Sequence, residues 1–111
     1  MIHVMLSLDL KNATKQQRDA FDGALKDEAF VKLTGVDTVW VFAFPNEPTE
    51  SAIVEASGVI QRFLKEVVEE LKIEKITYVL QIGNSAPVGA EIEDIYGTHK
   101  VRDFDPTVIA D

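Results

Sequence analysis

The sequence predicts an α+β fold of the ferredoxin-like type, in which an antiparallel four-stranded sheet carries two helices on one face. The chain has 111 residues, which is the size of a single domain. Segments with the period-two pattern of strands and the 3.6-residue pattern of helices follow in the order strand, helix, strand, strand, helix, strand. That order is the split βαβ arrangement, and right-handed crossovers place both helices on the same side of the sheet.

The first half of the chain supplies three strands and a helix. In residues 1–10 apolar side chains alternate with a mixed set, so one face of this strand is wholly apolar. Thr14 and Gln17 have the spacing of a capping box, which predicts a helix over residues 15–27. Its apolar stripe consists of Ala20, Phe21, Ala24 and Leu25. Strands are expected over residues 30–34 and 38–44, joined by a turn at residues 35–37.

The strand at residues 38–44 is apolar on both faces, as expected for a central strand that is covered on both sides. Either the aromatic set (Trp40, Phe42 and Phe44) or the valine set (Val39, Val41 and Ala43) can face the helices. Thr49 is a candidate N-cap for a second helix over residues 50–71, and a fourth strand follows at residues 75–83. Residues 1–84 therefore form the predicted domain. Residues 85–111 are expected to be a loop, a short edge strand at 91–96 and a loose tail from Asp103.

The composition limits the function classes. Lys and Arg number 11 and Asp and Glu 19, so the net charge is −8, which disfavours binding to nucleic acid or to anionic lipid. The absence of cysteine excludes disulfides and thiolate chemistry and favours a cytoplasmic location. No apolar run approaches the ~20 residues that cross a bilayer, and the N-terminus lacks the pattern of a signal peptide.

The predicted sheet has an open face that no helix covers. His3, Met5 and Ser7 of the first strand lie on it, as does Val79 of the fourth. This surface is too apolar to remain in water, so we expect a second copy of the sheet to cover it in a symmetric homodimer. The predicted interface residues are His3, Met5, Ser7 and Val79. The alternative cover is the segment 88–95, folded over the sheet or added to the edge of a partner's sheet.

Asp9 is the candidate catalytic and metal-binding residue, because it ends the first strand on the same open face. In a two-fold dimer two such carboxylates can hold Mg²⁺ or Mn²⁺, which prefer oxygen ligands. The alternative, and the commoner role for a lone acidic residue, is to cap the following loop. His3 lies six residues away, about 20 Å along a strand, so it cannot form an acid–base pair with Asp9 within one protomer.

Other candidate sites are weaker. Ser7 has no histidine nearby in sequence to activate it, which argues against a serine hydrolase. His99, Asp103 and Asp105 do not have the spacing of a defined metal site. No glycine-rich phosphate loop is present, so no cofactor-binding residues are predicted.

The segments LSLDL, TVWVFAF and ITYVLQIG, in this order around two helices, resemble the Cas2-like proteins. That family includes CRISPR-associated Cas2 and stand-alone relatives of the toxin and SinR-like type. The resemblance covers about residues 1–83 and is one of pattern. It implies a ferredoxin-like dimer and, for some members, metal-dependent endonuclease activity that would use Asp9.

Two functions from different classes follow. The leading hypothesis is a small acidic cytoplasmic protein that acts as a dimeric module binding another macromolecule, with a protein as its partner. Its basis is the apolar open face, the acidic surface and the lack of a recognisable catalytic set. The alternative is a Cas2-like nuclease that acts on RNA or DNA with Mg²⁺ or Mn²⁺. A third option is a small-molecule or regulatory domain formed when two such sheets pair.

Overall fold

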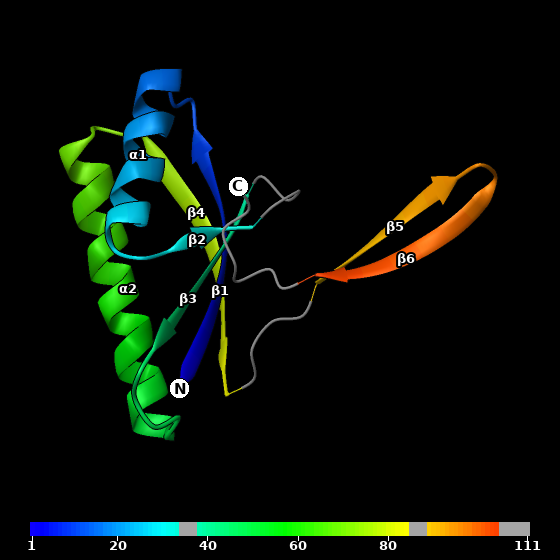
Figure 1. Cartoon of the computed structure of the whole chain (residues 1–111). Coiled ribbons are helices and arrows are strands. Elements are labelled where there is room, and N and C mark those ends of the chain that lie inside the picture. Colours follow the sequence, from blue (N-terminus) through cyan, green and yellow to red (C-terminus); the bar gives the residue numbers. More distant parts are fainter. Residues whose placement is uncertain (34–37, 85–88, 105–111) are drawn as a thin grey trace.

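A computed structural model of the chain describes residues 1–33, 38–84 and 89–104. Its core is a four-stranded antiparallel sheet of strand order β2-β3-β1-β4, and both helices cover one face of it (Figure 1). This confirms the predicted ferredoxin-like fold. The elements of this part are β1 (Ile2–Lys11), α1 (Lys15–Asp27), β2 (Val31–Lys32), β3 (Val39–Phe44), α2 (Glu50–Glu70) and β4 (Lys75–Gly83).

The hydrophobic core lies between the sheet and the helices. The even-numbered residues of β1 face it, and Leu6 lies opposite Trp40 of β3 and Leu80 of β4. Trp40 is 1% exposed, so the aromatic set of β3 is the set that faces the helices. Phe42 stacks on Phe30 with 4.7 Å between ring centroids. The valine set therefore lies on the opposite, open face.

The capping box predicted for α1 is present and has a second role. The Thr14 hydroxyl accepts a bond of 3.0 Å from the Gln17 backbone N–H, and the Thr14 N–H donates to Gln17 Oε1 at 2.9 Å. The same amide donates through Nε2 to the carbonyls of Leu71 and Lys72, at 3.1 and 3.2 Å. One side chain thus ties the start of α1 to the end of α2. Ala20, predicted in the apolar stripe, is exposed instead, since Phe21 and Leu25 fill the contact.

Both helices end in the same way. The residue after each C-cap, Ala29 or Lys72, has a positive φ of 67° or 56°. Phe30 donates to the carbonyl of Leu25 at 3.0 Å, which is the six-residue bond of a Schellman motif. This ending turns the chain sharply, and β2 is shorter than the predicted strand over residues 30–34. The predicted turn at residues 35–37 lies outside the described residues.

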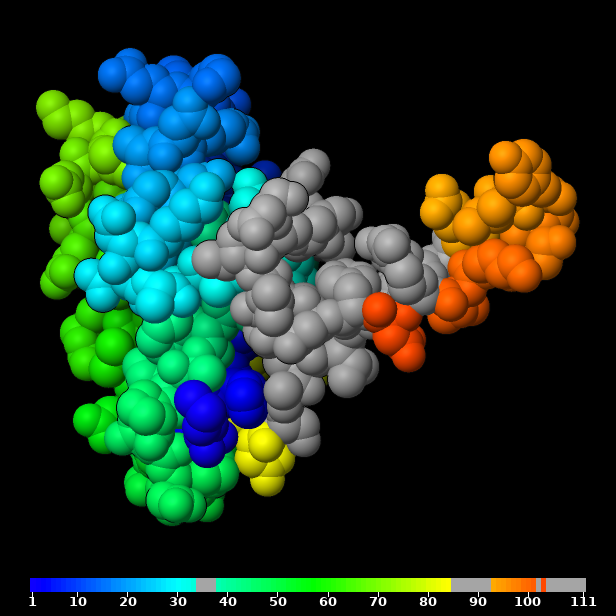
Figure 2. All heavy atoms as spheres, viewed as in Figure 1, coloured from blue at the N-terminus to red at the C-terminus, as the bar shows by residue number. Residues whose placement is uncertain are grey.

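The C-terminal part forms a separate hairpin of β5 (Gly89–Ile95) and β6 (Thr98–Phe104), here called the arm. It projects from the side of the sheet away from the helices (Figure 1, Figure 2). The strand predicted near residues 91–96 exists, but β6 was not predicted, and the tail predicted from Asp103 begins inside it. The segment predicted to fold over the sheet pairs with β6 instead. Residues 85–88 and 105–111 lie outside the described part.

Candidate functional site: the open face and the arm

The open face of the sheet is made by alternate residues of three strands. Met5 lies opposite Val41 and Gln81, and Ser7 lies opposite Val39 and Val79. These strands contribute His3, Met5, Ser7, Asp9, Val39, Val41, Ala43, Thr77, Val79 and Gln81, and β2 adds Val31, which lies opposite Val41. The structure thus brings all four predicted interface residues to one face.

This face is apolar at its centre and polar toward one end. Val41 is buried, Met5 and Val39 are half-buried, and the side chain of Val79 is 69% exposed. At the polar end Asp9 pairs with Thr77, and both side chains are exposed. Such a face combines an apolar centre with a hydrated rim, as protein–protein interfaces do.

A hollow of about 290 Å³ lies at the opposite end of β1, where the open face meets the end of β4. His3 and Met5 line it from β1, and Gln81 and Asn84 line it from β4 and just after. The imidazole and the two amides place hydrogen-bonding groups around an apolar floor. This arrangement suits an amphipathic side chain better than an ion.

Asp9 is exposed on the open face, and its own protomer offers little help with a metal. Of the described residues, no three or more His, Asp or Glu gather in a way that could hold an ion. Close to Asp9 in sequence, Lys11 forms an ion pair with Glu74, with 3.1 Å between Lys11 Nζ and Glu74 Oε2.

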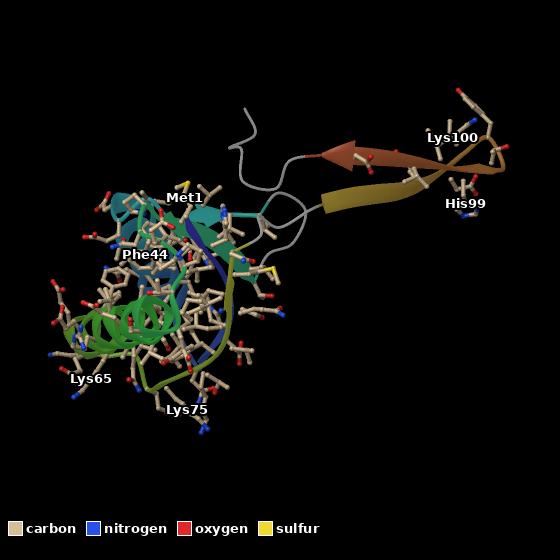
Figure 3. All side chains as sticks on the ribbon, turned by 90° about the horizontal axis from the view of Figure 1, so that it is seen from below. Met1, Phe44, Lys65, Lys75, His99 and Lys100 are labelled. Atoms are coloured by element: carbon tan, nitrogen blue, oxygen red, sulfur yellow. The ribbon has the colours of Figure 1, made fainter. Side chains whose placement is uncertain are left out.

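The other sequence candidates remain apart. His99 and Asp103 are exposed on β6, and Asp105 lies outside the described residues. His99 and Lys100 lie near the far end of the arm (Figure 3), away from His3 and Ser7 on the sheet. His3 and Asp9 lie at opposite ends of the β1 ladder, as the strand spacing predicts.

The arm ends in a two-residue turn, Tyr96-Gly97, that the sequence reading missed. Both residues have positive φ, 54° and 84°, as a type I′ hairpin turn requires. Asp94 Oδ1 accepts a bond of 2.9 Å from the Gly97 N–H. Tyr96 is fully exposed at the tip, Ile95 is exposed beside it, and Val101 is exposed in the middle of β6. The signal that could have found the turn is Gly97 at this position, with an aspartate three residues before it.

Comparisons with known proteins add little to this geometry. No family model matches the chain, and no curated protein matches it. Among solved structures, a similar chain is the guanylate cyclase domain of RhGC from Catenaria anguillulae in complex with GTP. Identity is 15% and the TM-score 0.42, over 96% of this chain and 68% of that one. Within the described residues no helix is long and apolar enough to span a membrane. The chain is thus a mixed α/β module whose function must be proposed from its own surfaces.

Proposed function

We propose that this chain is a dimeric interaction module whose open faces pair, and whose arm extends along the partner copy. The observation that carries the proposal is the apolar centre of the open face, where Met5, Val39 and Val41 lie together, with the exposed Val79 on the same face. The proposal includes a cytoplasmic location and a protein as the further partner. The lack of cysteine and the net charge of −8 support both.

The arm supports the same arrangement. An isolated two-stranded hairpin is at best marginally stable in water, because it has no second layer to bury its side chains. Each strand of the arm has seven residues, so it extends about 24 Å. Stacked sheets lie about 10 Å apart, so the arm is long enough to pass beyond a sheet packed on the open face. Ile95, Tyr96 and Val101 supply apolar contacts at its outer part.

Sedimentation equilibrium of two lysine variants tests the dimer. Val79→Lys places a charge on the open face at the edge strand β4, and we expect it to raise the dimer dissociation constant at least about tenfold. Val54→Lys is the matched control, because Val54 on α2 is 68% exposed and lies away from this face. A wild-type chain that stays monomeric at several hundred micromolar, or equal effects of both variants, would refute the proposal.

Hydrogen exchange of the arm tests its contact with the partner copy. Backbone amides of β5 and β6 should be protected at concentrations where the dimer forms and should exchange faster in Val79→Lys at the same concentration. Equal exchange rates in both proteins would show that the arm is not part of the interface. This result would not contradict the pairing of the open faces.

A Cas2-like nuclease is the second proposal, favoured by the exposure of Asp9 on the open face. Two such carboxylates, brought together by a two-fold axis, would hold Mg²⁺ or Mn²⁺, and the metal would act as a Lewis acid toward a phosphodiester. A titration with Mn²⁺ followed by amide NMR should broaden signals from residues 8–12 in the wild type and leave Asp9→Asn unaffected. RNA cleavage that survives Asp9→Asn would exclude this mechanism.

A further inference from the structure

One edge of the sheet is only partly paired. Val31 and Lys32 of β2 lie opposite Val41 and Trp40, and no described strand continues the pairing along the rest of β3. The Val39 carbonyl accepts a bond of 2.8 Å from the Leu33 N–H, so the odd-numbered residues of β3 point their backbone groups to this edge. The N–H and C=O of Ala43 therefore point to the side that β2 does not reach.

An aromatic groove runs beside this free edge, between β3 and α2. It has a volume of about 230 Å³, and Phe30, Phe42, Phe44, Val59 and Phe63 line it. The rings are in mutual contact: Phe42 meets Phe44 edge to face at 4.7 Å, and Phe30 stacks on Phe63 at 6.1 Å. A second hollow of about 150 Å³ continues it, sharing Phe44 and Val59. The rings thus form a preformed slot for apolar side chains.

The charges at this groove have one sign. Glu28 lines the first hollow and Glu55 lines the second, and each is the sole ionisable side chain among the described lining residues of its hollow. Arg62 of α2 is not among the described lining residues of either hollow. The net charge of −8 adds to the negative potential of the surface.

We propose that this groove binds an extended segment of a partner protein in which a bulky apolar residue has a basic residue two positions before it and two positions after it. The segment adds a short strand to β3 through the Ala43 backbone groups, which is the strand-addition mode of peptide recognition. These three side chains lie on one face of the added strand: the apolar one enters the aromatic slot, and the two Lys or Arg side chains pair with Glu28 and Glu55. The site lies on the other side of the sheet from the dimer face, so it stands or falls independently of the dimer.

Binding of a short labelled peptide tests the inference. The probe is fluorescein-labelled Lys-Val-Phe-Val-Lys with a blocked C-terminus, and fluorescence anisotropy gives its dissociation constant for the full chain. Two controls change one property each: a version with both lysines replaced by glutamate, and a version with N-methyl groups on the two valine nitrogens, whose N–H groups point to β3 in an antiparallel pairing when Phe faces the groove. We expect binding of the basic peptide, with the acidic peptide at least about tenfold weaker and the methylated peptide about fivefold weaker.

Charge reversal on the protein supplies the matched variants. Glu28→Lys with Glu55→Lys should weaken the basic peptide at least about tenfold. Glu69→Lys with Glu70→Lys changes the net charge equally at the far end of α2 and should leave the affinity unchanged. Amide NMR should locate the shifts at Ala43 and Phe44 of β3 and at Val59 of α2.

Several results would overturn the inference. These are no binding at millimolar protein, equal affinity for the acidic and basic peptides, equal effects of the two charge-reversal pairs, or peptide shifts centred on Met5 and Val79. Shifts at Ala43 and Phe44 that depend on protein concentration alone would assign the groove to a second copy of this chain, against the proposal.

Discussion

Gln17→Glu separates the two tasks that this side chain performs. A carboxylate can still accept the bond from the Thr14 N–H, so the capping box of α1 survives. It cannot donate to the carbonyls of Leu71 and Lys72, which the Gln17 amide contacts at 3.1 and 3.2 Å. The substitution therefore keeps the cap and breaks the link between the helices.

The expected cost follows from these contacts. Two lost hydrogen bonds contribute about 0.5–1.5 kcal/mol each, or about 1–3 kcal/mol together. The new charge is favoured by the N-terminus of α1 and disfavoured by the C-terminus of α2, each by about 0.3–1 kcal/mol, so these effects largely cancel. We expect the free energy of unfolding to fall by about 1–3 kcal/mol.

Urea denaturation at neutral pH measures this change, provided that the m-value stays constant. The loss should shrink as pH falls through the pKa of the introduced carboxyl, because its protonated form can donate again. If Gln17→Glu is as stable as the wild type or more stable, the hydrogen bonds from Gln17 to Leu71 and Lys72 do not contribute to the free energy of unfolding, and the reasoning is refuted.

Further predictions concern the core, a helix end and two charged residues. Leu64→Ala should cost about 2–5 kcal/mol by urea denaturation, because Leu64 is 1% exposed, and Phe63→Ala should cost less, because Phe63 is half-buried at the groove. Ala29→Gly should raise the unfolding free energy by about 1 kcal/mol in the same assay, since glycine accepts a φ of 67° freely. Asp19 raises the pKa of Lys15 through a 2.7 Å hydrogen bond and charge attraction. Proton NMR should therefore show this pair persisting until pH rises through that raised pKa, and high salt should weaken it.

Much of the central fold was predictable because several local signals agreed. The alternation in residues 2–10, the Thr14–Gln17 capping box and the Thr49 cap each mark an element that the structure contains. Which face of β3 meets the helices was not predictable, because the set that begins with Val39 and the set that begins with Trp40 are both apolar. That choice depends on the register with β1, which sets Trp40 opposite Leu6 and is a property of the pair of strands.

The arm was predicted only in part, for a physical reason. A strand with one buried face shows alternation, but side chains of β6 such as His99, Val101 and Asp103 are all exposed. Because neither face of β6 is buried, its sequence does not need to alternate between apolar and polar residues. The alternation by which a strand is recognised in a sequence is therefore absent. The groove was missed for a related reason, because it arises where β2 begins late, and that beginning depends on how the chain leaves α1.

The central place of β1 has a consequence for folding. Of the strands described here β1 is synthesised first, and it lies between β3 and β4, with Leu6 opposite residues as distant in sequence as Trp40 and Leu80. A nascent chain that ends before β4 leaves one edge of β1 without its ladder, so the domain can complete its sheet only late in synthesis. Such long-range closure slows folding, whereas a local hairpin such as the arm forms within about 1–10 microseconds. The two parts of this chain therefore acquire their structure on separate timescales, and the arm is synthesised only after the last strand of the sheet.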